Sequence, residues 1–276
     1  MIQFPLLAAA ALLAGQPPVA SPATGALPPS GKWLVEGQDN MCALSHAYGE
    51  GARQVTLAVR PWPIGSRTDV LLFRHGTQAD PDTGAGWVEP GTSGRKWDGS
   101  FTSYAIKGRE VNLYSLDVQE LPVAALADAG TIAIAFGKSR PVVVAQTGTK
   151  AAYAALAQCE DMLLKSLNVD PAVLANAATP ARRMEGWPSW FRREDYPNSA
   201  ISGGAQGSTS MLLTVDTGGS VVGCTTFGRS GNAAIDKAAC AAVTRRGRYI
   251  PAIGKNGQPT RFYDTMRVSW VLRQLP

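Results

Sequence analysis

The chain has 276 residues, of which 45% are hydrophobic and 17% are charged, and its formal net charge is +5. This length allows one or two domains, and the hydrophobic content excludes a chain that is disordered throughout. Residues 197–276 hold nine lysines and arginines against three acidic residues, so their net charge is +6 and that of the remainder is −1.

The basic character of residues 197–276 raises three interpretations. The first is a nucleic-acid partner. No helix-turn-helix, zinc-binding or aromatic-sheet motif accompanies the charge, so we do not expect such a partner. An acidic peptide or an anionic surface of the cell envelope is the second interpretation. The third is a helix end and a hairpin face that carry solvated charge and have no partner.

The first residues are typical of an export signal. Residues 4–15 form an almost wholly apolar run of twelve, and small residues follow, so we expect residues 1–20 to be a signal peptide, with Ala20 and Ala23 as cleavage points. Basic residues are missing before the run, which leaves a retained anchor as the alternative, although a spanning helix needs about 20 apolar residues. Residues 21–32 are rich in Pro, Ala, Gly and Ser and are predicted to form a flexible leader.

Residues 33–167 predict an N-terminal α+β domain. Residues 149–167 predict its main helix, because Tyr153, Leu156, Cys159, Met162, Leu163 and Leu167 fall roughly on one stripe. A second helix is expected within residues 118–129, and residues 76–100 predict a long loop or a ragged hairpin. Short apolar segments predict strands at residues 33–36, 43–47, 54–59, 70–73, 104–107, 110–114, 131–136 and 141–145.

Residues 168–195 lack strong periodicity and are expected to form a linker. Two arginine pairs bracket its three aromatic residues, Trp187, Trp190 and Phe191. We expect this basic and aromatic cluster to pack on the adjacent domain. Docking on a membrane surface or on a partner is the alternative.

Residues 196–276 predict a small module that begins with a hairpin. Met211, Leu213 and Val215 recur at the period of a half-buried strand within residues 207–216, although Leu212 breaks the alternation. A second strand is predicted at residues 220–227. Gly218-Gly219 between them suits a tight turn that requires positive φ.

A helix and a final strand complete this module. Residues 232–246 predict a helix, because Ile235, Ala238, Ala239, Ala242 and Val243 lie on one face, and Gly247 is expected to follow it in the left-handed conformation. Residues 261–272 predict a strand with Met266, Val268, Trp270 and Leu272 toward the core and Arg267, Ser269 and Val271 outward. The module is therefore expected to be a three-stranded antiparallel sheet with one main helix.

The four cysteines are Cys42, Cys159, Cys224 and Cys240. An even number in an exported chain favours disulfides. If the two domains fold independently, the pairs are Cys42–Cys159 and Cys224–Cys240. Metal binding is the other use of cysteines, but no CxxC motif or paired histidine accompanies them, and Cys240 as a small core residue is a further alternative.

Enzymatic chemistry has little support in this sequence. His46 and His75 are the only histidines, and no metal-binding spacing accompanies them. Gly137-Lys138-Ser139 lacks the glycine that begins a phosphate-binding loop. We therefore expect no catalytic residue, no cofactor and no metal site.

The order of residues over positions 196–276 resembles the TonB C-terminal domain family. Its members open near a Tyr-Pro pair, carry a V-D-x-x-G hairpin, enter the helix with S-S-G…L-D-x-A and leave it with F-x-P-A…G-x-P. Ile235 stands where leucine is usual and Tyr249 where phenylalanine is usual, and both are apolar exchanges of the kind that cores tolerate. The matching residues are Tyr196-Pro197, Val215-Asp216 with Gly219, Ser230-Gly231 with Ile235-Asp236 and Ala238, and Tyr249 with Pro251-Ala252, Gly257 and Pro259.

In that family, a periplasmic protein transmits force from an inner-membrane motor, and its C-terminal domain pairs with a peptide of an outer-membrane transporter. The peptide adds as a strand to the edge of the sheet. The resemblance implies an exposed last strand, with Arg267, Ser269 and Val271 as partner-binding residues. A protein or extended peptide is the implied partner.

This chain departs from the force-transducing members, because a globular domain stands where they have a long Pro/Glu/Lys-rich spacer. We therefore expect a periplasmic TonB-like binding protein that is not an enzyme. An energy transducer anchored in the inner membrane is one alternative. A small-ligand protein or enzyme built on the N-terminal domain is the other.

Overall fold

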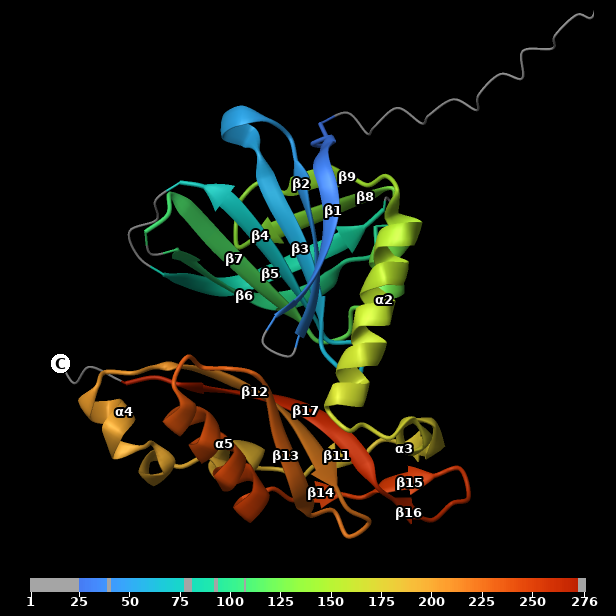
Figure 1. Ribbon diagram of the computed structural model, residues 1–276, viewed down its shortest axis with the longest axis vertical. Helices are drawn as coiled ribbons and strands as arrows, with labels where there is room; N and C mark the ends of the chain where they lie inside the picture. The colour runs from blue at the N-terminus through green and yellow to red at the C-terminus, as the bar shows by residue number, and fades with distance from the viewer. Residues whose placement is uncertain (1–24, 39–40, 77–80, 92–93, 107, 273–276) are drawn as a thin grey trace, which may run out of the picture.

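The computed structural model describes residues 25–38, 41–76, 81–91, 94–106 and 108–272 (Figure 1). The expected signal peptide, the alternative anchor at residues 4–15 and the first residues of the leader lie outside the described residues. The chain forms a mostly-strand N-terminal part, drawn above, and a C-terminal α+β module, drawn below it (Figure 1). Its class is α+β.

The N-terminal part is built on one antiparallel sheet of nine strands in the order β1-β2-β3-β4-β7-β6-β5-β8-β9. The segment expected as a loop or ragged hairpin contains β5 and the start of β6, and these two strands pair with each other. The strands are β1 (Pro29–Gln38), β2 (Met41–Tyr48), β3 (Val55–Pro61), β4 (Thr68–His75), β5 (Asp82–Pro90), β6 (Trp97–Ala105), β7 (Val111–Val118), β8 (Thr131–Phe136) and β9 (Val142–Ala145).

Leu27 closes this sheet on itself. Its N–H donates to the carbonyl oxygen of Val143 at 2.8 Å, and its own carbonyl oxygen accepts from the N–H of Ala145 at 2.9 Å. The first and last strands of the sheet are thereby joined. The flexible leader expected over residues 21–32 is therefore wrong for its second half, because main-chain pairing fixes Leu27 and the start of β1 at Pro29.

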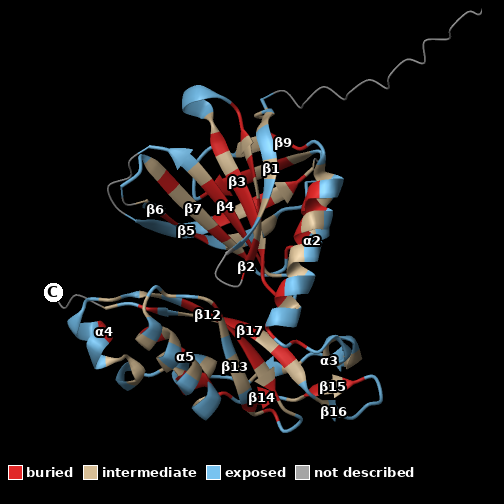
Figure 2. Ribbon diagram, viewed as in Figure 1, coloured by how far each residue is buried: buried red, intermediate tan, exposed pale blue. Residues whose placement is uncertain are grey.

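The core of the N-terminal part lies between the sheet and helix α2 (Thr149–Ser166). Figure 2 shows buried positions along one stripe of α2 and on the strands that face it. Leu156 and Leu163 belong to this stripe, whereas Met162 lies off it and is exposed. The Cys42–Cys159 disulfide joins β2 to α2. The second expected helix is only the short α1 (Val123–Ala127), since β7 continues to Val118.

The segment expected as a linker wraps the C-terminal module instead of spanning a gap. It contains α3 (Pro171–Asn176), β10 (Ala177–Thr179), β11 (Arg182–Arg183) and two short 3-10 helices, Trp187–Trp190 and Arg193–Asp195. β10 pairs with β15 (Ala252–Gly254), and β11 pairs with β14 (Tyr249–Ile250). Its aromatic residues pack on the module, as Trp190 is buried and its ring lies 5.5 Å from that of Tyr249.

The C-terminal module is a three-stranded antiparallel sheet in the order β13-β12-β17, with helix α5 (Ala233–Arg246) on one face. The strands are β12 (Gly207–Val215), β13 (Val221–Gly228) and β17 (Phe262–Trp270), and the smaller elements are α4 (Asn198–Ser202) and β16 (Pro259–Thr260). Ile235 and Val243 of α5 are fully buried with Leu213 of β12. The period-two and helical patterns therefore both point into this core.

Several residues of the family motifs hold turns and helix ends. The Asp216 side chain accepts hydrogen bonds from the N–H groups of Gly218 and Ser220. Gly219 has φ +82°, and a Cβ at this position would overlap the Tyr249 carbonyl oxygen. Asp236 accepts hydrogen bonds from the Thr209 hydroxyl and from the N–H of Ser230. These contacts are enough to explain why the motif residues stand where they do, without any role in binding a partner.

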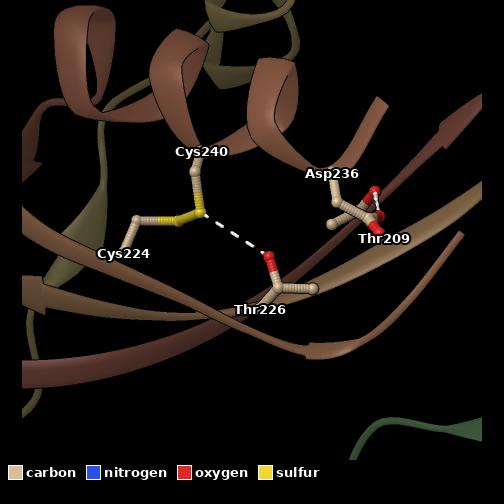
Figure 3. The surroundings of a disulfide bond; sticks show 5 residues. All are labelled: Thr209, Cys224, Thr226, Asp236 and Cys240. Atoms are coloured by element: carbon tan, nitrogen blue, oxygen red, sulfur yellow. Dashed lines mark hydrogen bonds between the residues drawn. A yellow bond between two sulfur atoms is a disulfide. The ribbon is translucent and has the colours of Figure 1, made fainter. Parts of the chain in front are cut away.

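The second disulfide joins Cys224 of β13 to Cys240 of α5, and the Cys240 sulfur lies 3.8 Å from the hydroxyl of Thr226 (Figure 3). The same helix ends differently from expectation. Gly247 has φ −63°, so it is extended and not left-handed. A glycine is required there for another reason, since a Cβ would overlap the Val243 carbonyl oxygen and the Val221 side chain.

The face of the module's sheet opposite α5 packs against the N-terminal part. Leu212 is only 4% exposed and, with Phe227 and Tyr263, belongs to the hydrophobic core of the N-terminal part. The Trp62 and Phe227 rings meet edge to face at 5.2 Å. This contact explains why Leu212 breaks the alternation of β12. No helix of the described residues combines the length and apolar character that crossing a membrane requires.

Candidate functional site: a strand edge and an interdomain groove

Strand β17 forms one edge of the module's sheet, and its main-chain groups alternate in direction. The N–H of Thr265 donates to the Asp264 side chain at 2.8 Å, and its carbonyl oxygen accepts from Arg183 at 2.7 Å. Both groups therefore point away from β12. Because residues of an antiparallel strand alternate between facing the partner and facing away, the N–H and C=O groups of Arg267 and Ser269 also point away from β12.

The two halves of this edge differ in what covers them. At Thr265 the edge is occupied by Arg183 of β11, which also binds Asp264 at 2.8 Å. Beyond it, Ser269 is exposed and Val271 is 65% exposed. Within the described chain, no further strand pairs beyond β17. The free part of the edge therefore runs from Arg267 to Val271, and we call it the β17 edge.

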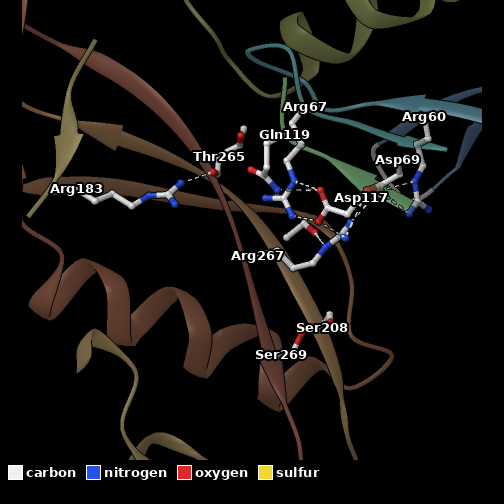
Figure 4. A network of polar contacts seen from close by, with 11 residues as sticks. Arg60, Arg67, Asp69, Asp117, Gln119, Arg183, Ser208, Thr265, Arg267 and Ser269 are labelled. Carbon is white, nitrogen blue, oxygen red and sulfur yellow. Dashed lines mark hydrogen bonds and ion pairs between the residues drawn. The ribbon is translucent and has the colours of Figure 1, made fainter. Parts of the chain in front are cut away.

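Arg267 links the β17 edge to the N-terminal part through its side chain (Figure 4). Its guanidinium donates to the Asp69 carboxylate at 2.9 Å and to the Ser210 hydroxyl at 3.1 Å, and it lies 3.4 Å from the Asp117 carboxylate. The same guanidinium lies 4.8 Å from the centre of the Trp62 ring. Arg267 is therefore a domain-docking residue as well as an edge residue.

The two carboxylates of this network also have partners within the N-terminal part. Arg60 binds Asp69 at 2.8 Å, and Arg67 binds Asp117. Burial alone would raise the pKa of Asp69, which is 0% exposed, but the charges of Arg267 and Arg60 and their hydrogen bonds outweigh it and hold that pKa below its ordinary value. Asp69 is therefore ionised at neutral pH, and its charge holds the two parts together.

A groove of about 910 Å³ lies beside this network. Its floor is the outer face of the N-terminal sheet, opposite the core, and one wall is the C-terminal module. Lining residues from the module are Gly207, Ser208, Ser210, Gly228, Arg229 and Arg267. The β17 edge and the groove therefore share Arg267.

The residues expected to bind a partner lie at different places. Ser269 and Val271 lie on the free edge, and the Ser269 hydroxyl is 2.7 Å from that of Ser208. Arg267 does not extend into solvent, because its side chain is in the ion-pair network (Figure 4). Asp69 and Trp62 were not expected to take part in the site. The one sign in the sequence was Leu212, an apolar residue where the alternation of its strand calls for a polar one. It indicates that the face of the module's sheet opposite α5 is covered.

The histidines and cysteines, which the sequence analysis considered as possible metal ligands, are not part of the groove lining. No three His, Cys, Asp or Glu side chains of that part gather in a way that would hold a metal ion. His46 is buried with its ring 4.4 Å from that of Trp33, and burial lowers its pKa. It is therefore a core residue.

Comparison with known proteins adds one match. Residues 192–272 match the family described as Gram-negative bacterial TonB protein C-terminal. Neither the curated proteins nor the solved structures contain a match to the chain. The match covers the sheet, the helix and the turns whose motif residues are described above, and residues 192–272 therefore belong to the TonB C-terminal domain family.

Proposed function

We propose that this protein is a TonB-like binding protein of the periplasm, which takes an extended peptide as an added strand along the β17 edge. The observation that carries the proposal is the row of main-chain groups at Arg267 and Ser269, which point away from β12 at an exposed edge. Such groups form a template for a further strand.

The length of the edge limits how the peptide binds. Arg267 and Ser269 offer two N–H and two C=O groups, and each hydrogen bond contributes about 0.5–1.5 kcal/mol. Main-chain pairing alone therefore gives modest affinity, and side chains of the peptide must supply the rest. Residues 197–276 carry a net charge of +6, so an acidic or neutral peptide is favoured, and the charge acts mainly on the association rate and its salt dependence.

We propose an outer-membrane transporter as the source of the peptide, on the strength of the family match alone. An energy transducer anchored at residues 4–15 is the alternative to a free periplasmic protein. The two differ in the N-terminus of the mature chain. N-terminal sequencing of protein from the periplasmic and membrane fractions distinguishes them, because only the anchored form keeps Met1.

A photo-crosslinking residue at Val271 tests the edge itself in cells of the native host. We expect a crosslinked partner from Val271 and none from Val222, which is also exposed, at 55%, but lies on the opposite edge strand, β13. Ser269→Pro removes the N–H at the centre of the edge, so the crosslink should disappear. Ser269→Ala keeps that N–H and should retain it. If folded Ser269→Pro captures the partner as the parent does, edge pairing is not how the module binds.

A further inference from the structure

The groove beside the ion-pair network has a floor made by the cross-strand neighbours of five strands. One row crosses the sheet as Ser45, Ala58, Leu71, Ser115 and Thr102. The next row is Thr56, Phe73, Leu113 and Tyr104. Small side chains flank Leu71 in the first row, and larger apolar ones stand in the second. The floor is therefore hollow near the C-terminal module, where hydroxyls accompany Leu71, and is mainly apolar in the second row.

Charge on the groove is almost all positive. Its lining holds four arginines, Arg60, Arg109, Arg229 and Arg267, and one acidic residue, Glu36. Arg60 and Arg267 are already bound to Asp69. Arg229, on the module's wall, and Arg109, beyond β6, are exposed, and neither makes an ion pair with another described residue. An anionic group is the occupant that this charge favours.

The floor excludes strand addition as the binding mode of the groove. β3, β4 and β7 are each paired on both sides, so their main-chain groups are taken up within the sheet. The face offers apolar side chains and hydroxyls, and no free row of N–H and C=O groups. An extended peptide would leave its own main chain unpaired there, which costs free energy. A hydrocarbon chain has no such groups to leave unpaired.

We propose that the groove binds a single-chain amphiphile of the fatty-acid type. Its anionic head lies at Arg229 on the module's wall, and its chain runs over Leu71 toward Phe73 and Leu113. The lining stretch of β7 from Ser115 to Val111 covers four residue steps, or roughly 13 Å, which accommodates a medium-length acyl chain. The volume of about 910 Å³ lies in the range of pockets that hold ligands of this size. The groove shares Arg267 with the β17 edge, but the proposed ligand does not depend on peptide binding there.

Titration of the full mature protein with dansylaminoundecanoic acid tests the proposal. We expect saturable binding at one site per chain, with displacement by dodecanoate. Each buried methylene changes the dissociation constant by up to about fourfold, so dodecanoate should displace the probe about tenfold better than decanoate. Dodecanol, which has no charge, should compete less well than dodecanoate. Binding that does not saturate, or that ignores chain length, overturns the proposal.

Matched variants locate the site. Arg229→Glu should weaken probe binding at least fivefold, whereas Arg261→Glu, an exposed arginine that is not part of the groove lining, should not change it. Phe73→Glu should abolish binding, and Val222→Glu should not. Tyr104→Glu, at a floor position that is 43% exposed, gives the same test if Phe73→Glu does not fold. Equal effects of the groove variants and their controls, or no effect of either, would refute the assignment.

Discussion

Replacing Arg267 with methionine should loosen the contact between the two parts of the chain without unfolding either. The methionine keeps an apolar stem beside Trp62 but removes the hydrogen bond to Asp69 at 2.9 Å and the one to Ser210 at 3.1 Å. Asp69 keeps Arg60, and Asp117 keeps Arg67. No buried carboxylate is therefore left alone, and the cost stays below the 3–5 kcal/mol of a broken buried pair.

The loss of docking free energy in Arg267→Met is estimated from the hydrogen bonds that the variant removes. A hydrogen bond between charged groups contributes about 1.5–3 kcal/mol, and the Arg267 side chain is 22% exposed, so solvent screening reduces that contribution. We expect the docking of the two parts to lose about 2 kcal/mol. A cycle with Asp69→Asn, Arg267→Met and the double variant should give a coupling of the same size.

Hydrogen exchange measured by mass spectrometry gives the local assay. In Arg267→Met, peptides that contain Trp62 and Phe227 should exchange faster, while the cores around α2 and α5 keep their protection. The matched control is Arg60→Met, which removes a partner of the same Asp69 but leaves the interdomain bond. A coupling below about 0.5 kcal/mol, or equal exchange in the two variants, would refute the claim that Arg267 holds the parts together.

Three further predictions concern stability. Replacing Cys224 and Cys240 with alanine should lower the free energy of unfolding by about 3 kcal/mol, as urea denaturation measures, because the disulfide closes a short loop. The pKa of Asp69 is lower in the folded protein than in the unfolded chain. The stability that its ionised carboxylate contributes is therefore complete above the unfolded pKa of about 3.9 and is lost as the pH falls through the folded value. Thermal melts from pH 5 to pH 2 should show this loss. Burial, with a smaller contribution from Asp161, raises the pKa of Glu160 to about 7. The native protein therefore loses stability as the pH rises from the unfolded pKa of about 4.3 to about 7, and the loss is complete above 7. Glu160→Gln should melt higher than the parent at pH 8 but not at pH 4.

The elements of the C-terminal module were predictable because their signals are local. The spacing of Met211, Leu213 and Val215 fixes a strand face, and Asn232 caps the helix that Ile235 and Val243 bury. The motif residues around Gly219 hold tight turns. Each of these features depends on neighbours within a few positions, so one sequence is enough to reveal it.

The arrangement of the parts was not predictable, since it depends on pairs far apart in the chain. Leu27 meets Val144, and Asp69 meets Arg267 across a separation of 198 residues. The alternation of its strand predicted that Arg267 points away from the core of its own module, and it does. The periodicity of one strand does not show that the N-terminal part lies against that outward face. The groove had no signal in the sequence, because its floor combines alternate positions of strands scattered over seventy residues.

The docking of β17 on Trp62 also imposes an order in time. The chain emerges from its N-terminus, and at about 5–20 residues per second the 198 residues between Asp69 and Arg267 take roughly 10–40 s to follow. In about the second half of that interval, once the chain has passed Ser166, the nine-stranded sheet and α2 are complete, but the Asp69 carboxylate lacks its second arginine. Until residue 227 is made, Trp62 also lacks Phe227. A chain that stops before β13 therefore has neither the aromatic ring that covers Trp62 nor the second arginine of Asp69, and a chain that stops between β13 and β17 lacks only that arginine.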